Sequence, residues 1–413
     1  MAKSRKDNKG RVLLRGESQR SQDMRYVYSF TDPMGKRKYI YATDLVELRR
    51  KEDRLKRDQL DGLDVYVAGK ATINYVFDRY MGLRDDLRKS TRGSYEYTYD
   101  HYVREEFGRK LICDVKYSDV RFFYFHLVKD LGLKSATVDN VHRLLSPTCD
   151  LAVRDDIIRK NPTVGIMAEV RKKTGNDGKV RHALTREQQK AFLDFLKDHP
   201  VYDHWLPLFT VLFGTGCRIG EVTGLRWKDL DFEKGSININ HSLVYYTGEI
   251  DGVRKSRLGI FLPKTEAGIR TVPMLKEVDA AFRTVYEDHK KTGFNKDVID
   301  GMTGFVFKNR YGNVMRQGAI NKAIKGIVNN YNEAEIIRAK KEHRDPLLIP
   351  LFSCHYTRHT FCSRFCETET NIKVIQIIMG HKDIRTTMDI YAEITEARKR
   401  EAIDKLSENM DIF

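Results

Sequence analysis

The chain has 413 residues, which is too many for one ordinary hydrophobic core, so two to four domains are expected. Its net charge of +16 and its pI near 9.4 predict an anionic partner. Nucleic acid is the first candidate, because each Lys or Arg that contacts a phosphate adds to the binding affinity. No apolar run reaches the roughly 18–20 residues that a membrane helix needs, and the N-terminus lacks an apolar signal core, so a membrane protein is excluded and a cytoplasmic one predicted.

Positive charge is concentrated at the N-terminus. The first 60 residues hold 17 Lys and Arg against 9 Asp and Glu, so this segment supplies +8 of the total +16. Alternating aromatic residues predict a strand over Arg25–Phe30, and a second strand returns over Lys38–Tyr41. We expect an earlier strand over Val12–Arg15 and a helix capped by Asp44. Residues 1–66 are therefore predicted to form a three-stranded sheet with one helix.

The next segment is predicted to be all-helical. Apolar and aromatic residues recur at helical spacing between residues 67 and 172, as in Val138, Val141 and Leu145. Most of this stripe is expected to form the core of a compact bundle. The polar, basic and glycine-containing stretch Glu169–Arg181 indicates an interdomain linker, to which we assign residues 173–183.

From residue 184 onward the pattern is mixed, mainly helical with a small sheet, and it carries five short motifs. They are TGCRIGE around Arg218, PKTEAG around Lys264, HYTRH from His355, MGHKD around His381 and TTMDIYAEI around Tyr391. Arginine matches a phosphate with two parallel hydrogen bonds, and lysine can protonate a leaving oxygen. A tyrosine hydroxyl becomes a nucleophile when a base and positive charge lie close to it. Together these residues suit attack on a DNA phosphodiester.

Local patterns place the first two motifs. A helix that ends at Gly214-Thr-Gly216 is followed by Arg218 at the start of the next helix, with Glu221 one turn later, where it could orient the arginine or a neighbour. Strands are expected over Ser236–Tyr245 and Leu258–Leu262. We expect the second of these to form a hairpin with Arg270–Pro273, with Lys264 at the tip and Lys255 as the alternative if this register is wrong.

The remaining motifs lie on predicted helices. A spacing of three puts His355 and Arg358 on one helical face. The apolar helix Ile372–Met379 stops at Gly380, which holds His381 at a turn. Thr386 is expected to cap the helix that carries Tyr391.

The order and neighbours of these motifs resemble the tyrosine recombinase (lambda-integrase-like) family, strongly over residues 180–395, and most closely the integrases of conjugative transposons. The resemblance implies a site-specific DNA recombinase that cuts and rejoins DNA through a 3′-phosphotyrosine and a Holliday junction, and so integrates and excises a mobile element. The implied catalytic residues are Arg218, Lys264, His355, Arg358, His381 and the nucleophile Tyr391.

The resemblance also implies a domain plan. Residues 1–66 would bind arm-site DNA, 67–172 would be the helical core-binding domain, and 184–395 the catalytic domain. Residues 396–413 would form a tail helix that either docks on a neighbouring protomer or stays on its own, a choice that the sequence leaves open. Expected partners are double-stranded DNA at core and arm sites, three further copies of the chain in a synaptic tetramer, an excisionase and a DNA-bending host protein. The protein would lie in the bacterial cytoplasm, with the nucleoid when bound to DNA.

Three other interpretations stay open at this point. A monomeric type IB topoisomerase uses nearly the same residues, and a non-catalytic DNA-binding regulator would not need Tyr391. Cys354, His355, His359, Cys362 and Cys366 could bind zinc, but their spacing does not match paired CxxC knuckles. We therefore expect no metal and no cofactor. The target DNA sequence and the overlap length cannot be read from the chain.

Overall fold

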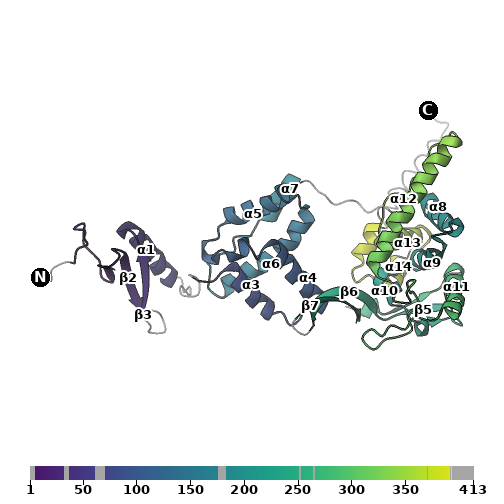
Figure 1. Ribbon diagram of the computed structural model, residues 1–413, viewed down its shortest axis with the longest axis horizontal. Helices are drawn as coiled ribbons and strands as arrows, with labels where there is room; N and C mark the ends of the chain where they lie inside the picture. Colours follow the sequence, from purple (N-terminus) through teal and green to yellow (C-terminus); the bar gives the residue numbers. More distant parts are fainter. Residues whose placement is uncertain are drawn as a thin grey trace. The chain divides into compact units, whose positions relative to one another are not determined.

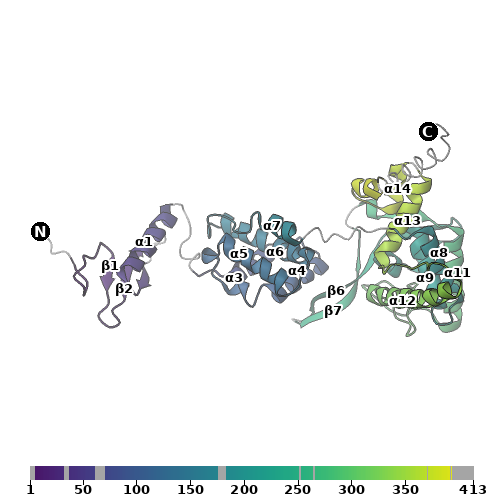
Figure 2. The same ribbon diagram turned by 90° about the horizontal axis from the view of Figure 1, so that it is seen from above.

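The computed structural model describes residues 5–31, 37–60, 70–174, 183–250, 253–263, 266–369, 371–390 and 392. The chain divides into two compact units, Met1–Gly178 and Lys179–Phe413. Figures 1 and 2 show the helices and strands of each unit from two directions. None of the helices in the described residues is long and apolar enough to cross a bilayer.

The chain begins with the predicted antiparallel sheet and helix. The elements are β1 (Glu17–Gln19), β2 (Tyr26–Thr31), β3 (Arg37–Ala42) and α1 (Leu45–Leu60), with β2 in the middle of the sheet. Tyr26, Ala42, Leu45 and Leu48 form a small core between α1 and the sheet. The helix starts where expected, because the Asp44 carboxylate accepts a hydrogen bond from the Val46 backbone N–H at 2.9 Å.

The expected strand over Val12–Arg15 is wrong. The first strand lies later, at Glu17–Gln19, and Leu14 is 51% exposed. The Glu17 backbone N–H donates to the Leu14 carbonyl, and the Leu14 N–H donates to the Glu17 carboxylate at 2.7 Å. This turn separates the apolar residues Val12–Leu14 from β1. The buried Glu17 side chain then forms an ion pair with Arg49 of α1.

The rest of the first unit is the predicted helical bundle. Its long helices are α3 (Ile73–Gly82), α4 (Lys89–Tyr102), α5 (Tyr117–Lys129), α6 (Ser135–Arg154) and α7 (Ile166–Thr174). Val138, Val141 and Leu145 are buried, as the helical spacing predicts. Phe77 and Tyr99 stack with ring centroids 3.5 Å apart, so much of the aromatic stripe is core.

The polar stretch interpreted as a linker begins too early. Residues Glu169–Thr174 form the C-terminal part of α7, because Val170 is fully buried in the bundle core. A basic surface on a helix and a basic linker have the same composition, and the single apolar residue Val170 was too weak a signal to separate them.

The second unit is mainly helical. Its helices are α8 (Arg186–Asp198), α9 (Leu206–Thr215), α10 (Ile219–Gly224), α11 (Lys276–Thr292), α12 (Gln317–Lys341), α13 (Cys354–Thr368) and α14 (Ile372–Met379). The apolar helix α9 lies in the centre and packs against α8, α11 and α13. Cys362 and Cys366 of α13 pack against Ile375 and Met379, which holds α14 on α13.

Two small sheets complete this unit. β4 (Leu230–Asp231), β5 (Ser236–Ile239) and β8 (Arg270–Pro273) form a three-stranded antiparallel sheet with β5 in the middle. β6 (Ser242–Ile250) and β7 (Val253–Phe261) form a separate two-stranded ribbon. In chain order an N-terminal sheet with a helix, a helical bundle and this mixed but mainly helical unit follow one another, which is the expected fold class (Figure 1).

The expected hairpin around Lys264 has the wrong pairing. β7 pairs with β6 along its whole length, and Arg270–Pro273 pairs with β5 instead. The sequence held the missed signal: Asp251-Gly252 is a strong two-residue turn dipeptide, and it separates two strands of nine residues each. Lys264 itself lies outside the described residues.

Candidate active site

Arg218 lies at the start of α10, behind a tight turn. α9 ends at Gly216, whose φ of +60° is left-handed, and a Cβ there would lie 2.3 Å from the Phe361 ring. The Arg218 backbone N–H donates to Glu221 Oε2, and its guanidinium donates to Glu221 Oε1, both at 2.8 Å. The side chain of Arg218 is still 44% exposed. The predicted contact between Glu221 and Arg218 is confirmed.

Glu221 has a second cationic partner, Arg270, which the sequence did not reveal as part of the site. Arg270 donates from Nη2 to Oε2 at 2.8 Å and from Nη1 to Oε1 at 3.2 Å. Burial favours the neutral acid, but the hydrogen bonds and charge of Arg270 and the charge of Arg218 outweigh it and lower the pKa of Glu221 to about 2. A signal existed: Arg270 and Val272 alternate inward along β8, and an inward arginine needs a buried partner.

Arg358 and His355 come from α13, one turn apart, as predicted. Arg358 is only 4% exposed, and its guanidinium donates to the backbone carbonyls of Gly216, at 2.8 Å, and Met379. Burial and then the charge of Arg218 lower the pKa of Arg358 to about 10, so it stays protonated at neutral pH. Because both carbonyl partners are uncharged, Arg358 is a buried cation suited to an anionic ligand. His355 is exposed on the same helix.

The C-terminal end of α14 brings three arginines together. The carbonyls of Ile378, Met379 and Gly380 accept hydrogen bonds from Arg270, Arg358 and Arg218 respectively. The last carbonyls of a helix have no partner within the helix and carry its negative dipole, so cations are favoured there. Residues separated by up to 162 positions in the chain thus meet at one helix end.

His381 follows this helix end and is 7% exposed. Gly380 is left-handed, with a φ of +62°, and turns the chain so that His381 Nδ1 lies 2.9 Å from the Thr387 hydroxyl. Burial and the charges of Arg358 and Arg218 lower the pKa of His381 to about 3, so the imidazole is neutral at pH 7. If Thr387 donates to Nδ1, the proton of His381 is on Nε2.

Two of the six predicted residues, Lys264 and Tyr391, lie outside the described residues. The other four, Arg218, His355, Arg358 and His381, come from α10, α13 and the turn after α14. The alternative lysine, Lys255, lies on β7 opposite Gly248. The helix expected to carry Tyr391 begins at Arg385, and Thr386 lies inside its first turn rather than at its cap, because the Asp383 carboxylate accepts the Arg385 N–H at 2.9 Å.

The zinc interpretation finds no support in the part of the chain that the structure describes, where no group of His, Cys, Asp and Glu side chains could hold a metal ion. Cys354, Cys362 and Cys366 are buried among apolar side chains of α13 and its neighbours.

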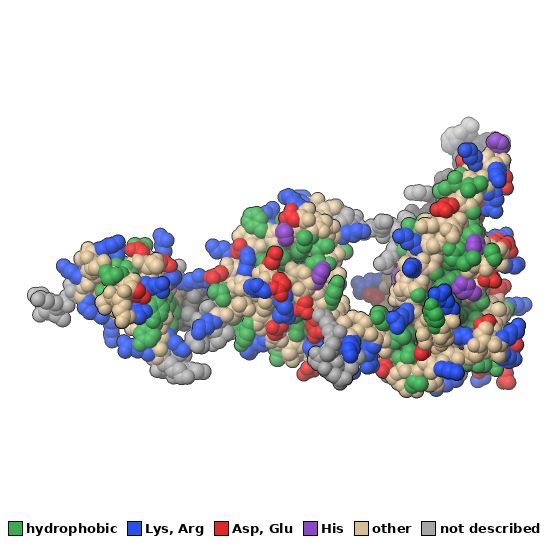
Figure 3. Space-filling model, viewed as in Figure 1, with side chains coloured by type: hydrophobic (Ala, Val, Ile, Leu, Met, Phe, Trp, Pro, Cys, Tyr) green, Lys and Arg blue, Asp and Glu red, His purple; other side chains and the backbone are tan. Residues whose placement is uncertain are grey.

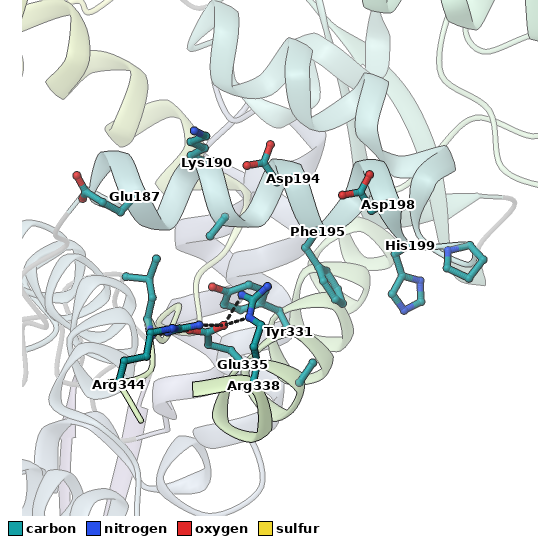
Figure 4. A pocket seen from close by; sticks show the side chains of 14 residues that line it. Glu187, Lys190, Asp194, Phe195, Asp198, His199, Tyr331, Glu335, Arg338 and Arg344 are labelled. Carbon is teal, nitrogen blue, oxygen red and sulfur yellow. Dashed lines mark hydrogen bonds and ion pairs between the residues drawn. The ribbon is translucent and has the colours of Figure 1, made fainter. Parts of the chain in front are cut away.

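A cavity of about 620 Å³ lies elsewhere in the second unit, between α8 and α12 (Figure 4). Glu335 pairs there with Arg338 and Arg344, and the aromatic ring of Phe195 lies nearby. None of the four arranged residues lines this cavity. It is therefore separate from the arginine cluster at the end of α14.

Comparison with known proteins matches this arrangement to a family. The model of the Phage integrase family matches residues 182–398, which is more than half of the chain and includes all six predicted site residues. The chain belongs to this family, the tyrosine recombinases. A second model, the DNA binding domain of Tn916 integrase, matches residues 1–59 of this recombinase.

The recombinase also matches whole relatives. It is 32% identical to the transposase from transposon Tn916 of Enterococcus faecalis, over 96% of this chain and 95% of the relative. The transposase from transposon Tn1545 of Streptococcus pneumoniae gives the same identity and coverage. Among solved structures, the Tn1549 transposon integrase in complex with transposon right end DNA aligns with a TM-score of 0.68 and 30% identity, over 82% of this chain and all of that one.

Proposed function

We propose that this recombinase integrates and excises a mobile DNA element by cutting and rejoining specific sites through a covalent bond between Tyr391 and a 3′-phosphate. One observation carries the proposal: Arg358 is a buried cation with uncharged hydrogen-bond partners, beside the half-exposed Arg218. Such a pair suits the two non-bridging oxygens of a phosphodiester and the negative charge that builds on them in the transition state.

The proposed step assigns one role to each residue. The Tyr391 oxygen attacks the scissile phosphorus as its proton passes to His355, and the bond from phosphorus to the 5′-oxygen breaks. Lys264 gives a proton to that leaving oxygen, so a 5′-hydroxyl and a 3′-phosphotyrosine result. Neutral His381 donates an Nε2–H hydrogen bond to a phosphate oxygen. The phosphotyrosine keeps the energy of the broken bond, so a 5′-hydroxyl of another strand can reverse the step.

The domain roles follow the relatives. The N-terminal segment, residues 1–66, would hold arm-site DNA, and residues 67–172 would grip the core site with the catalytic domain, residues 184–395. Lys and Arg side chains are spread over each part of the visible surface, which suits contacts with phosphates (Figure 3). Four copies would exchange strands through a Holliday junction, linked by the tails, residues 396–413. An excisionase and a DNA-bending protein would set the direction of the reaction in the bacterial cytoplasm.

The test is covalent capture on a suicide substrate in EDTA. The DNA is a nicked duplex that carries the end of the host element, and the readout is a protein–DNA band on a denaturing gel. A band with the wild type and none with Tyr391→Phe, while both variants bind the DNA, is the expected result. Binding without a band at the true site would favour the regulator, and a band without transfer between two duplexes would favour a topoisomerase.

A further inference from the structure

Arg270 is the most completely bonded buried cation near the proposed phosphate site, although no family motif pointed to it. Its side chain is 3% exposed. Besides Glu221 it donates to the Ile378 carbonyl at 2.7 Å and the Gly268 carbonyl at 3.4 Å, and Nη2 lies 3.8 Å from Cys217 Sγ. These hydrogen bonds occupy the donors of the guanidinium group, and burial keeps the group from contacting DNA. Any effect of Arg270 on the reaction therefore passes through its neighbours.

Glu221 is the neighbour through which Arg270 can reach the chemistry. Each oxygen of this carboxylate is shared: Oε1 accepts from the guanidiniums of Arg218 and Arg270, and Oε2 accepts from Arg270 and the Arg218 backbone N–H. The cluster of Arg218, Arg270, Arg358 and Glu221 carries three positive charges and one negative. Without Arg270, the buried carboxylate would have Arg218 as its nearest cation, and the charge offered to a phosphate would fall by one.

We propose that Arg270 is a positioning residue of the recombinase: it binds Glu221 and so keeps the charge of the Arg218 guanidinium available to the scissile phosphate. The proposal rests on the proposed function, since it needs a phosphate between Arg218 and Arg358. It adds a third arginine, which never contacts DNA, to the two that do. Because charges interact strongly where water is excluded, removal of one buried cation changes the site more than a surface change would.

The chain supplies a matched control in the same unit. Arg226 and Asp229 form a buried two-bond ion pair at 2.9 and 2.8 Å, with side chains 8% and 4% exposed. Like Arg218 and Glu221, they are three residues apart at the start of a short helical segment. The hydrogen bonds of the Arg226 guanidinium go to Asp229 rather than to the cluster. Arg226→Met thus measures what the loss of a buried pair does to folding alone.

The experiment measures single-turnover cleavage of the suicide substrate, DNA affinity and thermal stability for full-length variants. Arg270→Met is expected to cleave at least about 10-fold more slowly than wild type, with DNA affinity within about threefold. Arg226→Met is expected to lose similar stability but to cleave at the wild-type rate. The double variant Arg270→Met/Glu221→Gln has no carboxylate to hold Arg218, so its cleavage is expected to exceed that of Arg270→Met. If Arg270→Met does not fold, Arg270→Lys, which keeps the charge, takes its place with a smaller expected deficit.

Substrate chemistry tests the route. On a methylphosphonate, which lacks the negative charge at the scissile position, the deficit of the Arg270 variant is expected to fall to within about threefold of wild type. The proposal would be overturned if Arg270→Met also cleaved the methylphosphonate much more slowly than wild type, or if the double variant were as slow as Arg270→Met. It would also be overturned if a sulfur leaving group at the 5′-position restored the cleavage rate of Arg270→Met, since that result would implicate Lys264. Failure of the wild type to form any adduct would instead overturn the proposed function.

Discussion

Gly380 supports a prediction that joins backbone strain to catalysis. Its φ of +62° is left-handed, and a Cβ there would lie 2.9 Å from Arg270 Nη1 and 3.0 Å from the Ala267 carbonyl oxygen. Gly235 has nearly the same φ, +59°, but nothing lies within 4 Å of its Cβ position. The pair Gly380→Ala and Gly235→Ala therefore separates the left-handed backbone from crowding at the site.

The magnitudes follow from these two costs. Alanine in the left-handed region costs about 1–2 kcal/mol, which is the whole effect expected for Gly235→Ala. Gly380→Ala adds about 1–3 kcal/mol of overpacking, because the Ala267 carbonyl is backbone and Arg270 is held by its hydrogen bonds. At about 2–4 °C per kcal/mol for a unit of this size, the melting temperature of Gly380→Ala should lie about 2–12 °C below that of Gly235→Ala.

Activity should fall by more than stability explains. To make room for the methyl group, the turn that holds His381 must move away from Arg270 and the Ala267 carbonyl, and a displacement of about 1 Å in an active site can cost ~100-fold in rate. Thermal unfolding and single-turnover cleavage, both below the melting temperature, measure the two effects. If Gly380→Ala has the same melting temperature as Gly235→Ala and cleaves DNA at the wild-type rate, the inferred packing of this turn against Arg270 is wrong.

Of the four further predictions, three concern single residues and one concerns the removal of metal. Arg358→Gln should lower cleavage by about 10²–10³-fold in single-turnover assays and leave DNA binding in gel shifts, and an unchanged rate would remove Arg358 from the site. Burial and nearby arginines lower the pKa of His381 to about 3, so as pH falls the unfolded chain binds a proton before the folded one does; the free energy of unfolding therefore falls between pH 6.5 and pH 3, by up to about 1.4 kcal/mol per pH unit. In urea unfolding at pH 7 and pH 4.5, His381→Gln should lose less stability on acidification than wild type, and an equal loss would contradict the buried neutral imidazole. Glu335→Gln should destabilise the second unit in urea unfolding by only about 1–2 kcal/mol, since the arginine partners of Glu335 are partly exposed. The folded variant should cleave DNA at the wild-type rate because the cavity is separate from the arginine cluster, and slow cleavage would connect the cavity to the site. Exhaustive removal of metal with EDTA should leave the cleavage rate unchanged, whereas recovery on adding a divalent ion would refute the metal-free step.

The motifs determined much of this protein without coordinates, because local chemistry dictates them. Arg218 at a helix start, Arg358 on the face of α13 and Gly380 at the end of α14 follow from caps, spacing and a left-handed glycine, all of which act within a few residues. The same local rules gave the aromatic strands of the N-terminal sheet and the core stripe of the bundle.

Only the tertiary structure decided what lies between those motifs. β8 pairs with β5 instead of forming the expected hairpin, although the ribbon β6–β7 lies between them in the chain. The sequence of one strand does not show which other strand it will pair with. Arg270 became part of the site because folding brought Glu221 and the end of α14 to it, across 49 and 108 residues of chain. The pKa values of Glu221, Arg358 and His381 likewise arise from burial and from charges that are distant in sequence, so no reading of the sequence could assign them.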